Sequence, residues 1–101
     1  MARKLGIYVT SDQHLEPLIK LCRAAYHKRV DVDIFFTHLG CNMTNDERFS
    51  ELAQYARLAV CKVCYDEHRG DLPTAGLTDK DYATQERHCD IIDTCDRYVN
   101  F

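Results

Sequence analysis

Apolar residues recur along this chain in two patterns, as short continuous runs and at helical spacing. The runs at residues 4–10, 30–36 and 58–61 are rich in β-branched and aromatic side chains and predict buried strands, and residues 98–101 predict a short last strand. Residues 14–29, 44–56 and 78–95 repeat apolar positions every three or four residues and predict amphipathic helices. This alternation predicts an α/β fold, a single three-layer domain whose mostly parallel sheet of four to five strands has helices on both faces.

Local signals place the ends of several elements. Pro17 is compatible only with the first turn of a helix, so the first helix is predicted to begin near His14. Thr44, answered by Glu47, fits a capping box for the second helix. A breaker-rich loop follows at residues 70–76. The third helix is predicted to begin near residues 78–79 and therefore to include Tyr82.

Length and composition narrow the class of protein. A chain of 101 residues indicates one domain, spanning residues 1–101, and 46% hydrophobic residues are too many for a disordered chain. The formal net charge is −3 and no basic cluster occurs, so nucleic acid is excluded as the expected partner. No apolar run has the length of a transmembrane helix and the N-terminus lacks a signal-peptide core. We therefore expect a cytoplasmic protein with no membrane partner.

Six cysteines are many for such a chain, and in a reducing compartment they indicate buried thiols, a metal site or thiol chemistry. The leading candidate is Cys61. The third strand is predicted to end at Cys61, or as late as Cys64, and Cys61 sits at the first turn of the helix that follows. The helix dipole favours a thiolate there, and Cys61, Cys64 and His68 share one helix face. This segment lies at the carboxyl edge of the predicted sheet, where α/β proteins bind ligands.

Each candidate has a chemical and a structural interpretation. Cys61 is either a nucleophilic thiolate or a buried cysteine that packs as a small hydrophobe. Cys64 is either a resolving thiol or an inward-packing residue of the helix, and Cys41, in the loop after the second strand, is either a second resolving thiol or an ordinary loop cysteine. His68 is either a partner of the thiolate or a solvated side chain.

A metal site is the alternative use of the same residues. Cys61, Cys64 and His68 have the spacing of half a zinc site, and Cys41 or His38 is the candidate fourth ligand. No second Cys-x2-Cys or His-x3-His pair completes that pattern, so no metal is assigned. Gly6 stands alone in the first strand without a phosphate-binding loop, so no nucleotide or flavin cofactor is expected.

The chain resembles the small DsrE/DsrF-like proteins of sulfur relay. The similar segments are residues 4–10, 32–36 and 58–61, with Arg69 and Gly70 downstream, and the closing residues 95–101. The resemblance implies a flavodoxin-like domain in trimers or hexamers, in which Cys61 carries sulfur as a persulfide between sulfur-relay or sulfur-carrier proteins. This chain departs from the family in the additional Cys64, in a slightly longer spacing from Cys61 to Arg69, and in having four predicted strands instead of five.

Three hypotheses about function follow. The first is a cytoplasmic sulfur-relay protein that accepts sulfane sulfur on Cys61, with Cys41 or Cys64 assisting. The second is a binding or redox-sensing module of the same fold whose cysteines are structural. The third is a small zinc- or iron-binding domain.

Overall fold

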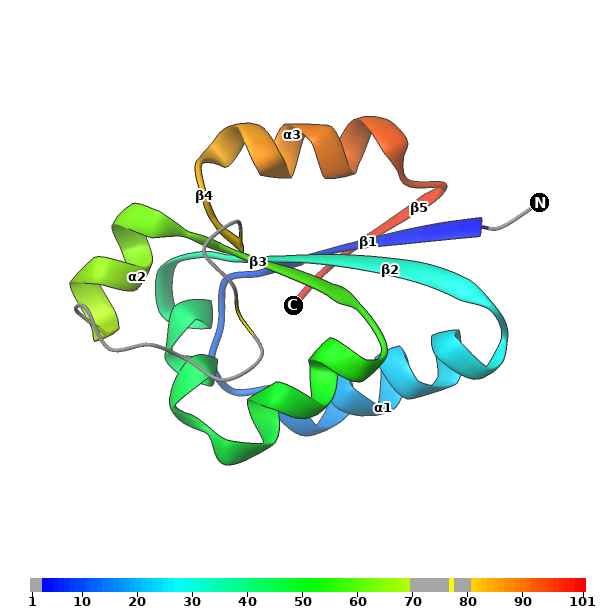
Figure 1. The fold of residues 1–101 in the computed structure, drawn as a ribbon, viewed down its shortest axis with the longest axis horizontal. Helices are drawn as coiled ribbons and strands as arrows, with labels where there is room; N and C mark the ends of the chain where they lie inside the picture. Colours follow the sequence, from blue (N-terminus) through cyan, green and yellow to red (C-terminus); the bar gives the residue numbers. More distant parts are fainter. Residues whose placement is uncertain (1–2, 70–76, 78–80) are drawn as a thin grey trace.

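In the computed structural model, which describes residues 3–69, 77 and 81–101 and only the backbone of residues 67–69, five strands form one parallel sheet (Figure 1). The elements in chain order are β1 (Arg3–Val9), α1 (Leu15–His27), β2 (Val30–Phe36), η1 (His38–Asn45), η2 (Glu47–Gln54), β3 (Arg57–Cys61), α2 (Lys62–Arg69), β4 (Tyr82–Ala83), α3 (Gln85–Thr94) and β5 (Arg97–Asn100). The strand order across the sheet is β4-β3-β2-β1-β5. α1 and the 3₁₀ helices η1 and η2 lie on one side of the sheet and α3 on the other, which confirms the predicted three-layer α/β domain (Figure 1).

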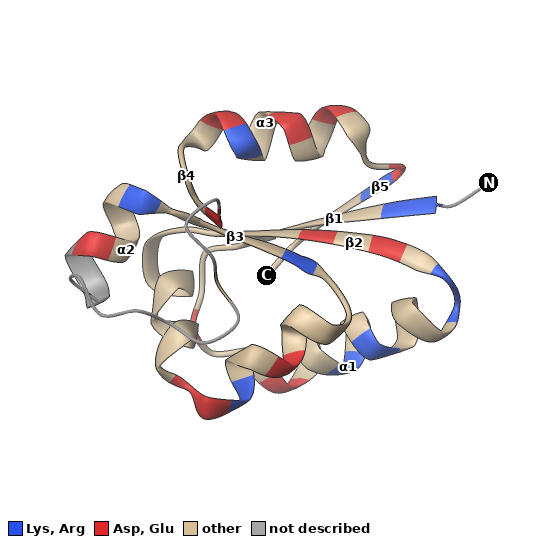
Figure 2. Cartoon of the chain, in the orientation of Figure 1, with Lys and Arg blue, Asp and Glu red and all other residues tan. Residues whose placement is uncertain are grey.

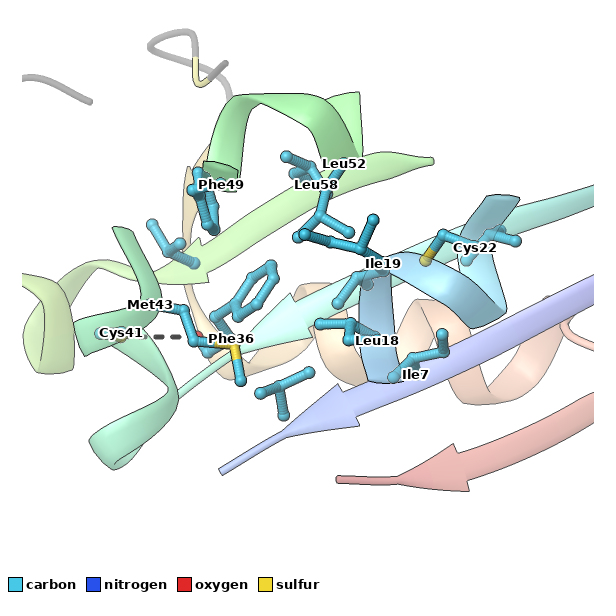
Figure 3. Packing of buried hydrophobic residues seen from close by; sticks show 14 of the residues in the cluster. Ile7, Leu18, Ile19, Cys22, Phe36, Cys41, Met43, Phe49, Leu52 and Leu58 are labelled. Carbon is cyan, nitrogen blue, oxygen red and sulfur yellow. Dashed lines mark hydrogen bonds between the residues drawn. The ribbon is translucent and has the colours of Figure 1, made fainter. Parts of the chain in front are cut away.

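The main core fills the space between the sheet and α1. Ile7, Ile34 and Leu58 are register partners across β1, β2 and β3, so they form a continuous apolar row on this side. α1 packs Leu18 and Ile19 onto that row, because its buried positions recur at helical spacing (Figure 3). The longest apolar runs of the sequence thus become the central strands.

The opposite side of the sheet is covered by α3 alone among the described helices. The strand residues between the main-core positions point this way, and Phe35, Ala59 and Cys61 form a second cluster with Ile91 of α3. Gly6 lets the helix come close, because a Cβ there would lie 2.9 Å from Cγ2 of Ile91. The alternation of side chains along β3 therefore puts the Cys61 thiol on the α3 side of the sheet.

Several predicted boundaries are confirmed. His14 is the N-cap of α1 and Lys28 its C-cap, as Pro17 and the closing cations indicated. Cys61 is the last residue of β3 and α2 begins at Lys62, so the predicted junction of strand and helix at Cys61 is correct. No helix in the described part of the chain has the length and apolarity needed to cross a membrane.

The prediction that Tyr82 is helical is wrong, and the sheet has five strands, the upper number of the predicted four to five. Tyr82 and Ala83 form β4 and pair in parallel with Val60 and Cys61 of β3. The Tyr82 ring packs edge-on against Tyr65 of α2, with 4.9 Å between ring centroids. A run of two residues carries too little pattern to be recognised as a strand, but this pairing covers the edge of β3 and moves the start of α3 to Gln85.

The predicted capping box of the second helix is also wrong. The Thr44 hydroxyl donates to the carbonyl of Cys41 at 2.7 Å, within the preceding 3₁₀ helix. Asp46 is the N-cap of η2, and its carboxylate accepts a hydrogen bond from the backbone N–H of Arg48 at 2.9 Å. The segment predicted as one loop and one α-helix therefore forms two consecutive 3₁₀ helices, whose buried residues Phe49 and Leu52 still face the core (Figure 3).

Candidate functional site

Cys61 lies where β3 gives way to α2, at the carboxyl edge of the sheet. Its side chain is 6% exposed. In this position Cys61 is the residue before the first turn of α2, and the backbone N–H of Cys64, three residues later, lowers the pKa of its thiol. This is the position of an N-cap residue, at which the free N–H groups of the first turn favour a negative charge.

The surroundings of Cys61 favour its thiolate. Burial alone raises the pKa of the Cys61 thiol, but four hydrogen bonds act in the opposite direction, and the net effect is a pKa below the ordinary value. In decreasing order of effect, these hydrogen bonds come from the backbone N–H of Cys64, the Cys64 side chain, the Gln85 side chain and the Thr37 side chain. A thiolate supplied with several donors in a nearly buried position is a nucleophile prepared by the fold.

Thr37 joins the three segments that make the site. It follows β2 directly, is fully buried, and is fixed by its backbone N–H, which donates to the carbonyl of Val9 at 2.9 Å. Its hydroxyl oxygen lies 3.3 Å from Sγ of Cys64 and accepts a hydrogen bond of 3.3 Å from Nε2 of Gln85, the first residue of α3. The hydroxyl thus connects the ends of β2 and β3 with the start of α3.

Tyr8 of β1 extends this polar group on the α3 side. Burial raises the pKa of the Tyr8 phenol, and the neighbouring thiols Cys61 and Cys64 raise it further, while a hydrogen bond with Thr37 lowers it. The His88 ring of α3 stacks on the Tyr8 ring, with 3.8 Å between centroids and an interplanar angle of 10°. The phenol is therefore held beside the thiols by a stacked aromatic neighbour.

His88 is a supporting residue and does not contact the thiols in any described interaction. Its Nε2 lies 2.7 Å from the hydroxyl of Tyr98 in β5, and its ring also faces Phe35 at 5.7 Å. Burial lowers the pKa of His88, so the ring is neutral at pH 7 and packs as an aromatic. The stack Phe35, Tyr8 and His88 forms one wall of the site.

Cys41 approaches the site from the other side of the sheet. It is fully buried in the main core, and its thiol donates to the carbonyl of Phe36 at 3.7 Å (Figure 3). Burial raises the pKa of the Cys41 thiol to about 12, and the nearby thiols Cys64 and Cys61 contribute to the rise. Cys41 therefore stays a protonated thiol, and Cys64 is the better placed of the two candidate resolving cysteines.

The other candidates from the sequence are His68 and the alternative metal site. The backbone of His68 lies in α2, as expected, but its side chain is outside the described residues, so its predicted role as thiolate partner stays a prediction. Among the described side chains, no group of three or more histidines, cysteines and carboxylates has the arrangement of a metal site. All six cysteines are free thiols.

Three site residues were not predicted from the sequence. Thr37 directly follows a strand ending at the functional edge, which is the signal that could have identified it. Gln85 was assigned to a helix interior, and only the unrecognised strand β4 brings the start of α3 to this edge. Tyr8 lies inside a run predicted as a buried strand, and only the register of β1 decides which side its ring faces.

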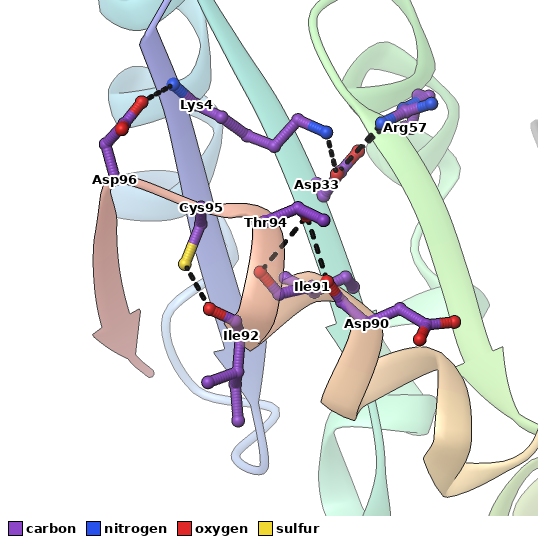
Figure 4. A network of polar contacts seen from close by, with 9 residues as sticks. All are labelled: Lys4, Asp33, Arg57, Asp90, Ile91, Ile92, Thr94, Cys95 and Asp96. Carbon is purple, nitrogen blue, oxygen red and sulfur yellow. Dashed lines mark hydrogen bonds and ion pairs between the residues drawn. The ribbon is translucent and has the colours of Figure 1, made fainter.

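The other half of the α3-covered face carries charges. The carboxylate of Asp33 accepts two hydrogen bonds from Arg57, at 2.7 and 3.0 Å, and Nζ of Lys4 lies 3.4 Å away (Figure 4). Asp33 is 7% exposed, so these cations compensate a buried charge. Around the thiols, by contrast, η1 contains no Lys, Arg, Asp or Glu (Figure 2).

The chain matches no protein-family model and no curated protein.

Proposed function

We propose that this protein carries sulfane sulfur as a persulfide on Cys61 and passes it to a thiol of a partner protein. The observation that carries the proposal is the position of the nearly buried Cys61 directly before α2, packed with Cys64, where its surroundings lower the pKa of its thiol. These surroundings favour negative charge on the sulfur both before attack and when it leaves again. A purely structural cysteine gains nothing from such an arrangement, because a neutral buried thiol needs no donors.

The proposed transfer needs no external oxidant or reductant. The Cys61 thiolate attacks the outer sulfur of a donor R–S–SH, a new S–S bond forms on Cys61, and the donor leaves as its thiol. In the second step, an acceptor thiolate attacks the outer sulfur of the Cys61 persulfide. The S–S bond to Cys61 breaks and Cys61 returns to a thiolate, which the same hydrogen bonds stabilise.

The proposed setting follows from the same chemistry. The proposed location is the cytoplasm, because a chain with six cysteines and thiol chemistry suits a reducing compartment. The partners in this proposal are other sulfur-relay or sulfur-carrier proteins, and the chain itself acts as a homo-oligomer. Val63 and Leu39, exposed by 66% and 52%, lie in α2 and η1 on either side of the thiols and offer apolar contact to a partner.

The test compares two single substitutions. Cys64→Ser keeps a side-chain donor beside Cys61, because a hydroxyl replaces the thiol, and it leaves Cys61 as the lone reactive thiol of the pair. After brief exposure to glutathione persulfide, we expect Cys64→Ser to gain the mass of one sulfur atom, mapped to Cys61, and to release it to an added acceptor thiol. Cys61→Ser should gain no sulfur at either position.

Cys89→Ser is the matched control for accessibility. Cys89 is exposed on α3, away from the described contacts of the site, so its replacement should leave sulfur uptake unchanged. Uptake that survives in Cys61→Ser, or that maps to Cys89, would refute Cys61 as the carrier. A folded Cys64→Ser protein that takes up no sulfur would instead favour the binding or redox-sensing module.

A further inference from the structure

Cys61 and Cys64 form a pair that can do more than carry sulfur. Building on the proposed function, we infer that the pair reduces sulfane sulfur to sulfide, with Cys64 resolving the Cys61 persulfide into a Cys61–Cys64 disulfide. The substrate class is a small persulfide or polysulfide. This activity replaces relay when no acceptor thiol is present.

The geometry of the helix start brings the two sulfurs together. Cys61 occupies the N-cap of α2 and Cys64 the third position of its first turn. Side chains at these two positions face each other, which is why a capping box links them. Here Cys61 and Cys64 pack in the same cluster on the α3 side of the sheet, and the Cys64 backbone N–H and side chain act together to lower the pKa of Cys61. A Cys-x-x-Cys pair at a helix N-terminus cycles between dithiol and disulfide.

Burial separates the roles of the three neighbouring thiols. Cys61 is 6% exposed, Cys64 is half-buried, and Cys41 is fully buried with its thiol donating to the carbonyl of Phe36. Cys64 is thus the thiol that both touches Cys61 and reaches solvent, where a leaving sulfide must go. The Cys41 thiol is held by its hydrogen bond to Phe36, and its burial leaves no path by which sulfide could reach solvent.

Thr37 keeps Cys64 in this orientation. Its hydroxyl lies 3.3 Å from Sγ of Cys64 and is itself fixed by the Nε2 of Gln85 at 3.3 Å. Thr37 is fully buried, so it holds this position without competition from water. The Cys64 thiol is therefore held between Thr37 and the sulfur that it would attack.

The reaction balances without a further reactant. Cys61 first takes the outer sulfur of R–S–SH and releases R–SH. Sγ of Cys64 then attacks Sγ of Cys61, the bond from Cys61 to the outer sulfur breaks, and that sulfur leaves as sulfide with the Cys64 proton. Two thiols are oxidised to one disulfide, and one sulfane sulfur is reduced to hydrogen sulfide. A dithiol reductant of the cell restores the pair.

The experiment is a single turnover of the fully reduced chain with glutathione persulfide, without acceptor or reductant. We expect the wild type to release one hydrogen sulfide per chain and to lose two hydrogens, with the disulfide mapped to Cys61 and Cys64. Cys64→Ser should keep the sulfur on Cys61 and release sulfide only at the background rate. Cys41→Ala should behave as the wild type.

The outcomes separate this inference from the relay function. If the wild type holds a stable persulfide on Cys61 and releases no sulfide, the resolving step is refuted while the relay remains. If neither the wild type nor Cys64→Ser reacts at Cys61, both fail. As an independent readout, equilibration in a glutathione redox buffer should yield the Cys61–Cys64 disulfide, and a pair that stays reduced at every ratio overturns the inference.

Discussion

Removing the Thr37 hydroxyl is the most direct test of how the fold activates Cys61. Thr37→Val keeps the branched shape of a fully buried side chain and deletes its one polar atom. The change removes the 3.3 Å contact with Cys64 and the acceptor of Gln85, and with them the hydroxyl that lowers the pKa of Cys61. Each of these losses weakens the stabilisation of the Cys61 thiolate by its neighbours. We therefore expect the pKa of Cys61 to rise.

The size of the effect follows from the chemistry of the lost bond. A hydrogen bond to a charged group contributes about 1.5–3 kcal/mol. Since about 1.4 kcal/mol corresponds to a factor of ten, the ratio of thiolate to thiol at Cys61 should fall roughly tenfold to a hundredfold. We expect the lower end of this range, because Thr37 has the smallest effect of the four groups that donate to Cys61.

The assay is the rate of alkylation of Cys61 by iodoacetamide as a function of pH, followed by peptide mapping. The thiolate is the reactive form, so the midpoint of the rate profile should move to higher pH in Thr37→Val. Thr44→Val is the matched control, because it deletes another buried threonine hydroxyl, one that donates to the carbonyl of Cys41. That variant should lose stability without moving the midpoint.

Two results would refute this account of activation. In the first, the midpoint of the alkylation profile is unchanged in Thr37→Val although the protein is folded. In the second, the midpoint moves equally in Thr44→Val. In the first case Thr37 only packs between the strands. In the second case the reactivity of Cys61 follows overall stability, and the specific hydrogen bonds have no separate effect.

Three further predictions concern stability, each read from denaturant unfolding. A Cβ at Gly40 would clash with the backbone carbonyl of Val9, so Gly40→Ala should cost about 1–3 kcal/mol, whereas Gly6→Ala meets only movable side chains and should cost less. Burial raises the pKa of Cys22 to about 12, so the free energy of unfolding should fall as pH rises from about 8.5 toward 12, and less steeply in Cys22→Ala. Asp33→Asn should cost about 1–2 kcal/mol, because it leaves two cations without their carboxylate.

The central strands and α1 could be predicted because burial dominates their sequences. β2 has five consecutive buried residues, so its run of buried positions indicates a strand that is covered on both sides of the sheet. α1 has a proline at its start, cations at its end and an apolar stripe between them, and the structure begins and ends it accordingly. Where many residues share one physical constraint, the pattern in the sequence is long enough to recognise.

The missed elements depend on single contacts instead. β4 consists of two half-buried residues that pair with Val60 and Cys61, and such a pairing leaves no periodicity in the sequence. The segment after β2 forms two 3₁₀ helices, and the start of the second is set by Asp46 and not by the Thr44 hydroxyl, because that hydroxyl donates to a carbonyl within η1. Competing local hydrogen bonds of this kind are decided by tertiary packing.

The choice between Cys41 and Cys64 shows the same limit at the site itself. The sequence puts both near the carboxyl edge of the sheet and cannot tell which side of the sheet each thiol faces. The alternation of β3 turns Cys61 toward α3, and the first turn of α2 brings Cys64 against the same cluster as well as against the main core. η1 instead folds back under the sheet and buries Cys41 in the main core, with its thiol donating to Phe36. A position at the right edge is therefore necessary for chemistry, and the side of the sheet decides which thiol takes part.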